Sequence, residues 1–95
     1  MRVCITGGTG SLGQALVRRL LADDAERIVV LSRDEVKQAR MAEELGDPPP
    51  MRWMLGDVRD RDRLEAAFWG VEWVIHAAAL KRVDGVSFHP TEVEK

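Results

Sequence analysis

The amino-acid sequence predicts an α/β domain in which a parallel β-sheet carries helices on both faces. Four short apolar runs alternate with three segments of helical character along the 95 residues, and such alternation is typical of parallel sheets. The composition, 45% hydrophobic and 32% charged, fits a single globular domain. Short right-handed crossovers between the strands give an expected strand order of 3-2-1-4. We expect the sheet to be truncated after its fourth strand.

The first half of the chain predicts two strands and two helices. Three apolar residues at 3–5, closed by glycines, indicate a strand that is buried on both faces. From Ser11 onward, the apolar residues follow helical spacing. The apolar run at 28–31 predicts the second strand. Asp34 is a suitable N-cap for a polar helix that should stop at Gly46.

The second half predicts one more helix between two strands. After a proline turn, the apolar run at 51–55 predicts the third strand. Four apolar residues then have the i, i+3, i+4, i+7 spacing of an amphipathic helix: Leu64, Ala67, Phe68 and Val71. Asp60 is expected to cap that helix. The run at 73–75 predicts the fourth strand, and its uncovered edge should promote self-association.

A glycine-rich segment joins the first strand to the first helix. Gly7, Gly10 and Gly13 recur at every third position, a variant of the fingerprint that binds dinucleotides. Gly7 permits a tight turn, Gly10 lets backbone N–H groups approach a pyrophosphate, and Gly13 lets the helix lie close to the sheet. This context favours a dinucleotide site over the alternative, an ordinary glycine-rich turn.

The end of the second strand predicts the choice of cofactor, because in this type of fold it meets the adenosine ribose. Ser32, Arg33 and Lys37 offer a hydroxyl, a guanidinium and an ammonium group there. These groups suit the 2′-phosphate of NADP better than the free hydroxyl of NAD. In the alternative interpretation, Arg33 is solvated and Asp34 only caps the helix.

Two later segments should also face the cofactor. Asp57 and Val58 follow the third strand, where the carboxylate can accept from the adenine amine and the valine can cover the ring. Asp57 could instead cap the next helix, and the sequence leaves both roles open. The alanines at 77–79 either pass beneath the nicotinamide ribose or are ordinary packing. Lys81 either touches the cofactor or substrate, or is a solvated loop residue.

Composition and charge exclude several other classes. A net charge of −2 gives no basic field for binding nucleic acid, and no apolar run is long enough for a membrane span. The single cysteine, Cys4, cannot form an internal disulfide and should be a buried hydrophobic residue, so a cytoplasmic location is the default. His76 has no companion at metal-ligand spacing and should be a hydrogen-bonded imidazole, so we expect no metal site.

Four segments, at 5–13, 32–38, 56–60 and 76–83, together resemble the extended short-chain dehydrogenase/reductase superfamily. Within it they are most similar to the inverting UDP-N-acetylglucosamine 4,6-dehydratases of polysaccharide biosynthesis. The resemblance implies a Rossmann-like fold and an NADP-dependent cycle in which hydride leaves C4 of the sugar, water is eliminated across C5 and C6, and hydride returns to C6. It also implies cofactor contacts at Gly7, Thr9, Gly10, Ser11, Leu12, Gly13, Ser32, Arg33, Lys37, Asp57, Val58, Ala77, Ala78, Ala79 and Lys81.

The same resemblance implies that residues 1–95 are the NADP-binding portion of a longer nucleotide-sugar enzyme. The catalytic groups of the family would lie beyond Lys95, and this chain has no Tyr to deprotonate the sugar hydroxyl. We therefore assign no catalytic residue and expect no dehydratase turnover by the chain alone. Two alternatives stay open: the same portion of an NAD(P)-dependent nucleotide-sugar epimerase, and a free-standing dinucleotide-binding module without chemistry.

Overall fold

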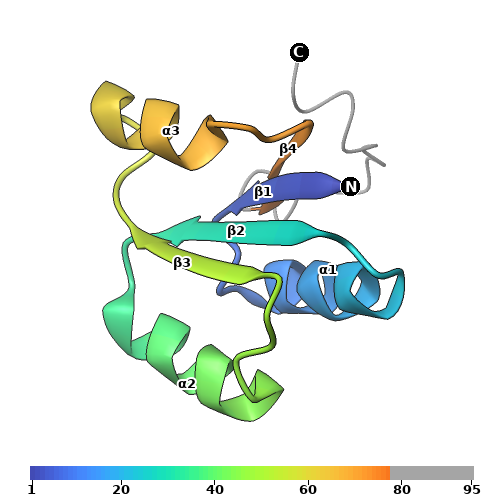
Figure 1. Ribbon diagram of the computed structural model, residues 1–95. Helices are drawn as coiled ribbons and strands as arrows, with labels where there is room; N and C mark the ends of the chain where they lie inside the picture. Colours follow the sequence, from blue (N-terminus) through green and yellow to red (C-terminus); the bar gives the residue numbers. More distant parts are fainter. Residues whose placement is uncertain (78–95) are drawn as a thin grey trace, which may run out of the picture.

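The computed structural model describes residues 1–77, which form a four-stranded parallel sheet with three helices (Figure 1). Along the chain the elements are β1 (Arg2–Thr6), α1 (Ser11–Ala22), β2 (Arg27–Ser32), α2 (Glu35–Leu45), β3 (Met51–Leu55), α3 (Arg61–Phe68) and β4 (Trp73–His76). The strand order is β3-β2-β1-β4. The predicted fold class and strand order are therefore confirmed.

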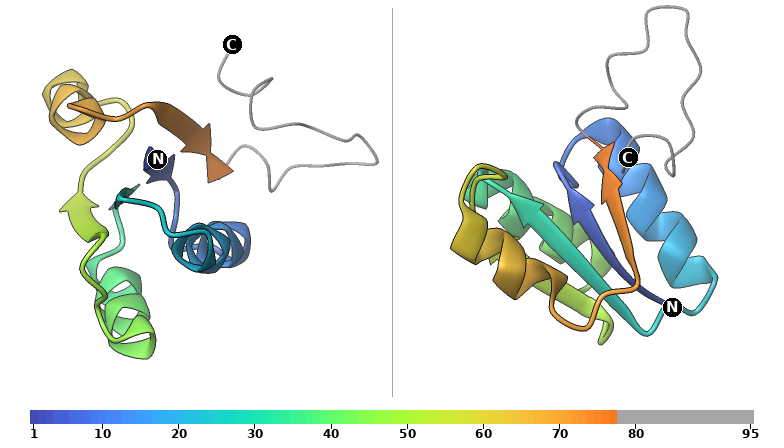
Figure 2. Two further views of the ribbon diagram at one scale, coloured as in Figure 1. Left: turned by 45° about the vertical axis from the view of Figure 1, so that its right-hand side comes forward. Right: turned by 90° about the horizontal axis from the view of Figure 1, so that it is seen from above.

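The sheet separates two helical layers. Figure 2 shows α1 and α2 on one face of the sheet and α3 on the other. Val3 and Ile5 of β1 share a buried cluster with Met41 of α2. Cys4, which points to the opposite face, shares a second cluster with Ala67 of α3. Cys4 is fully buried, which confirms that it is a buried hydrophobic residue, and this burial raises the pKa of its thiol to about 12.

Both ends of α2 follow from residues at its boundaries. The Asp34 carboxylate accepts the backbone N–H of Lys37 at 2.9 Å, which satisfies one of the free donors of the first turn. Gly46 follows the last turn with a φ of 75°, a left-handed conformation that glycine adopts at little cost. The predicted start and stop of this helix are confirmed.

The predicted extent of α3 is wrong at its C-terminal end. Asp60 caps the helix as expected, since its carboxylate accepts the N–H of Arg63 at 3.2 Å. The helix nevertheless ends at Phe68 and does not include Val71. Gly70 has a φ of 71°, so the chain leaves the helical path before it reaches Val71. Val71 still packs against the cluster under α3, which explains why its spacing fitted a helix.

β4 forms one edge of the sheet within residues 1–77. It pairs only with β1, and His76 at its end lies opposite Thr6. The Nδ1 atom of His76 is 2.8 Å from the Thr6 Oγ1, which confirms the predicted hydrogen-bonded imidazole. Over the same residues, no helix combines the length and the apolar character needed to cross a bilayer.

Candidate functional site

A hollow of about 940 Å³ lies at the carboxyl edge of the sheet, where β1, β2 and β3 end. Its volume is within the range of ligand-binding pockets. It is lined by the glycine loop after β1, the end of β2 with the first turn of α2, and the segment after β3. The predicted cofactor contacts that it brings together are Gly7, Thr9, Gly10, Ser32, Arg33, Lys37, Asp57 and Val58.

The other predicted contacts are not in this hollow. Ser11 lines a smaller hollow of about 200 Å³ between α1 and α2, which shares part of the glycine loop with the first. Leu12 is half-buried and lines neither hollow, and Gly13 is buried. Ala77 is fully buried after β4. The remaining predicted contacts lie outside the described residues: Ala78, Ala79 and Lys81.

Gly7 and Gly13 hold the loop after β1 close to β2 and to α1. Gly7 has a φ of 69°, as a tight turn requires, and its N–H donates to the Leu31 carbonyl of β2 at 2.9 Å. A Cβ at Gly13 would overlap the backbone of Gly8. The sequence predicts a close approach of α1 to the sheet, and the structure shows that the close contact is with the loop backbone itself.

The N-terminus of α1 is open toward an anion. α2 and α3 are each preceded by an aspartate N-cap whose carboxylate accepts a backbone N–H. By contrast, the N-cap of α1 is Gly10, which makes no side-chain hydrogen bond, and the first turn of α1 has no acidic residue. The first N–H groups of a helix have no partner within the helix and carry a partial positive charge. This end of α1 is therefore suited to a phosphate group.

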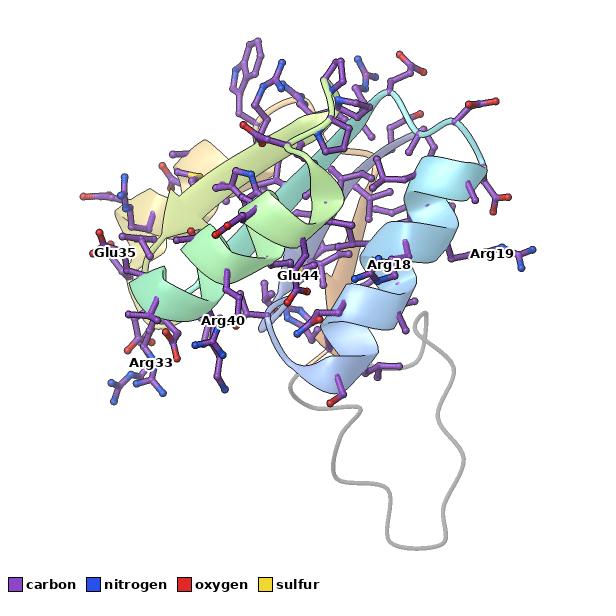
Figure 3. The ribbon with its side chains drawn as sticks, turned by 90° about the horizontal axis from the view of Figure 1, so that it is seen from below. Arg18, Arg19, Arg33, Glu35, Arg40 and Glu44 are labelled. Carbon is purple, nitrogen blue, oxygen red and sulfur yellow. The ribbon has the colours of Figure 1, made fainter. Side chains whose placement is uncertain are left out.

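The end of β2 and the first turn of α2 supply a hydroxyl and two cationic groups to the wall of the hollow. Ser32 is 8% exposed, and its Oγ accepts from the Gln38 Nε2 at 2.9 Å. Arg33 is 74% exposed at its side chain, with its Nη1 3.5 Å from the Asp57 Oδ2. Figure 3 shows Arg33 beyond the N-terminal end of α2, pointing out of the fold. Lys37, in the first turn of α2, is also exposed.

Asp57 is held mainly by Arg59, two residues further along the chain. Its Oδ1 accepts the backbone N–H of Arg59 at 2.9 Å, and its Oδ2 accepts from the Arg59 Nη2 at 2.9 Å. These hydrogen bonds, together with the charges of Arg59 and Arg33, lower the pKa of Asp57 to about 2. Because Asp60 caps α3, Asp57 does not serve as the helix cap, which was one of the two roles that the sequence left open.

Two residues of this region were not predicted from the sequence to belong to the site. Arg59 lines the hollow, and an acid two residues before an arginine is a spacing that permits such local pairing. Gln38 is buried in α2, and its Nε2 donates to the Met54 carbonyl of β3 at 2.8 Å as well as to Ser32. Its helical spacing from Met41 marks Gln38 as part of the inner face of α2, which is the signal that the sequence offered.

Asp57 should remain ionised far into the acid range. Its pKa in the folded chain is about 2, compared with an ordinary value of 3.8, so its ionised form favours folding. This contribution is complete above about pH 4 and is lost as the pH falls toward 2. A carboxyl-carbon NMR titration should place the Asp57 midpoint near pH 2. In Arg59→Gln the midpoint should rise toward the ordinary value, and an unchanged midpoint would show that Arg59 does not hold this carboxylate.

The chain is similar in sequence to known enzymes. It matches the profile of the family described as "Polysaccharide biosynthesis protein" over residues 3–95. It is 46% identical over 94 residues to the inverting UDP-N-acetylglucosamine 4,6-dehydratase of Campylobacter jejuni, a match that covers 98% of this chain and 28% of the relative. It is 44% identical over 92 residues to the UDP-glucose 4-epimerase of Rickettsia felis, covering 93% of this chain and 27% of the relative. The chain thus spans less than a third of the length of these relatives.

A solved structure shows the same arrangement of elements. The X-ray structure of Pen from Bacillus thuringiensis superposes with a TM-score of 0.78 at 35% sequence identity. The match covers 86% of this chain and 25% of Pen. The four-stranded sheet and its helices therefore recur as a portion of a longer protein.

Proposed function

Since this chain belongs to the polysaccharide biosynthesis protein family, we propose that it is the dinucleotide-binding portion of a nucleotide-sugar enzyme. The relative at 46% identity is a dehydratase of UDP-N-acetylglucosamine, so 4,6-dehydration of that nucleotide sugar is our first candidate for the activity of the whole enzyme. Epimerisation of a nucleotide sugar is the second candidate, because a UDP-glucose 4-epimerase is 44% identical.

One observation carries this proposal: an uncapped helix N-terminus, a tight glycine turn and a cationic strand end meet at the same hollow. A dinucleotide needs these features together, because it presents a pyrophosphate and an adenosine ribose a short distance apart. The residues fit such a group, since the N-terminus of α1 has no acidic residue that would repel a pyrophosphate.

In the proposed complex, the N-terminus of α1 would hold the pyrophosphate and the end of β2 would hold the adenosine ribose. Val58, which lines the hollow with an exposed side chain, would cover the adenine ring. Both carboxylate oxygens of Asp57 already accept from Arg59, so Asp57 serves the adenine amine only as a shared acceptor. When bound, the nicotinamide ring would supply hydride transfer, and the residues described here would hold and orient the dinucleotide.

We propose NADP rather than NAD as the dinucleotide. Arg33 and Lys37 line the hollow beside Ser32, on a wall that also carries Asp34 and Glu35, so two cations and a hydroxyl are available near the expected position of the 2′-phosphate. The ion pair between Arg33 and Asp57 is 3.5 Å long and the Arg33 side chain is 74% exposed, and a pair with such an exposed partner contributes little. Arg33 can therefore exchange its carboxylate partner for a phosphate, which it binds with charge-assisted hydrogen bonds.

The variant Gly10→Asp tests the proposed binding. Gly10 has a φ of −75° and a ψ of 175°, an extended conformation open to any residue, and aspartate is a favoured N-cap. We expect the variant to fold as stably as the parent chain. We also expect it to bind both NADP and NAD roughly tenfold more weakly, because its carboxylate occupies the helix N-terminus and repels the pyrophosphate. Isothermal titration calorimetry with each dinucleotide measures the effect.

Gly10→Ser is the matched control, since serine caps a helix without adding a charge. It should retain more of the binding than Gly10→Asp. A parent chain that binds neither dinucleotide would contradict the proposed function. Equal binding by the serine and aspartate variants would contradict the placement of the pyrophosphate at α1.

We also propose that the chain self-associates through β4. Within residues 1–77 this strand has no partner on its outer side, and Trp73 is 47% exposed. An unpaired strand edge with apolar side chains is a template for pairing. Sedimentation velocity at increasing concentration should reveal a dimer or larger species, and Trp73→Lys should shift the population toward monomer. Trp69→Lys, at an exposed tryptophan outside the sheet, is the control, and a parent chain that stays monomeric at high concentration would refute the proposal.

A further inference from the structure

Gln38 connects the ends of two strands from beneath the proposed site. It is 6% exposed, and its side chain extends from α2 toward the sheet. The Nε2 atom donates to the Met54 carbonyl of β3 at 2.8 Å and to the Ser32 Oγ of β2 at 2.9 Å. Both hydrogens of the amide nitrogen are thereby used.

The Met54 carbonyl determines the direction of the second hydrogen bond. A carbonyl only accepts, so the amide group of Gln38 must present its nitrogen, and not its oxygen, to this point. The same nitrogen then faces Ser32, whose Oγ must accept. The hydroxyl hydrogen of Ser32 is therefore directed away from Gln38, and within residues 1–77 no acceptor receives it. Ser32 lines the hollow beside Arg33 and Lys37.

We propose that Gln38 is a positioning residue that fixes the Ser32 hydroxyl as a donor toward the ribose 2′ position of the dinucleotide. This inference rests on the proposed function. A phosphate dianion can only accept hydrogen bonds, so it needs a donor there, whereas a free 2′-hydroxyl can accept or donate. A hydroxyl fixed as a donor thus favours NADP over NAD, and Gln38 sets this preference without touching the ligand.

The variant Gln38→Glu reverses the direction of this hydrogen bond at nearly constant side-chain volume. A carboxyl group accepts from Ser32, and in its protonated form it still donates to the Met54 carbonyl. The Ser32 hydroxyl then turns away from the ligand. We expect the ratio of the NADP and NAD dissociation constants to move about tenfold toward NAD, as in Ser32→Ala, because a hydrogen bond to a charged group is lost. Gln38→Met, which removes both donors, should move the ratio less, by roughly threefold.

Measuring both dinucleotides separates this role from a structural one. If a variant is partly unfolded, both apparent affinities fall by the same factor, and the ratio of the two constants is unchanged. Gln14→Glu is the matched control, because Gln14 also donates to a backbone carbonyl, that of Thr9, at 3.0 Å. Gln14 lies beside the glycine loop, which would face the pyrophosphate that both dinucleotides share. The ratio of the NADP and NAD dissociation constants in Gln14→Glu should therefore stay at the parent value.

A double-mutant cycle completes the test. In the Ser32→Ala background, adding Gln38→Glu should not change the ratio further, because the hydroxyl through which Gln38 acts is absent. An unchanged ratio in Gln38→Glu alone, or an equal shift in the Ser32→Ala background, would overturn the inference while leaving dinucleotide binding intact. If the parent chain binds neither NADP nor NAD, the proposed function fails and this inference fails with it.

Discussion

Gly13→Ala should destabilise the chain strongly, although the same change in an exposed helix stabilises by about 1 kcal/mol. The new Cβ would overlap the Cα and carbonyl group of Gly8. Gly8 has little room to move, because it is buried and even a Cβ built on it would approach the side chains of Val30 and Ile5 closely. We expect the free energy of unfolding to fall by roughly 3 kcal/mol, a large part of the stability of a small domain. Urea denaturation followed by circular dichroism measures it.

Two control substitutions separate the effect of steric overlap at residue 13 from the effects of helix propensity and backbone conformation. Ala15→Gly, on the exposed face of α1, should cost about 1 kcal/mol through helix propensity alone. Gly46→Ala meets no atom within 4 Å but keeps a φ of 75°, so it should cost about 1–2 kcal/mol through backbone conformation alone. A Gly13→Ala chain as stable as the parent would show that α1 does not contact the glycine loop.

Arg33→Asp should reverse the dinucleotide preference from NADP to NAD. In the proposed site, the Arg33 guanidinium binds the 2′-phosphate with charge-assisted hydrogen bonds that contribute roughly ten- to a hundredfold in affinity. An aspartate would repel the phosphate but accept a hydrogen bond from the free 2′-hydroxyl of NAD. The glycine loop is unchanged, so NAD should still bind. Calorimetric titration of both dinucleotides against both proteins measures the reversal.

Arg19→Asp makes the same change of charge away from the proposed ribose position. Arg19 pairs with Asp23 at 3.1 Å, and Figure 3 shows it on the opposite flank of the molecule from Arg33. Arg19→Asp should change the affinities for NADP and NAD only slightly and by similar factors, because salt screens charges at this separation. Equal affinities of the parent chain for NADP and NAD would contradict the role assigned to Arg33.

The fold could be predicted because its signals are local in the sequence. Each strand is an apolar run of suitable length, and each run is separated from the next by a segment with helical spacing. Asp34 and Asp60 stand directly before the helices that they cap, and Gly46 stands directly after one. The glycine motif is also contiguous, so its position between β1 and α1 required no knowledge of tertiary contacts.

The contacts within the candidate site join segments that are distant in the sequence, and no local pattern specifies them. Arg33 approaches Asp57 only because β2 and β3 end side by side. Gln38 reaches from α2 to the Met54 carbonyl of β3. The end of α3 was misjudged for a related reason, because the apolar spacing continues to Val71 although the helical backbone does not. Side-chain periodicity reports burial, and burial persists after the helix has ended.

β1 is the first strand of the chain, yet it lies between β2 and β4 in the sheet. Within residues 1–77, those that line the larger hollow fall between 6 and 59, whereas β4 begins at Trp73. On the ribosome, the walls of the hollow are therefore synthesised before the strand that covers one flank of β1. During that interval β1 presents an unpaired apolar edge, a condition in which nascent domains misassemble or need chaperones.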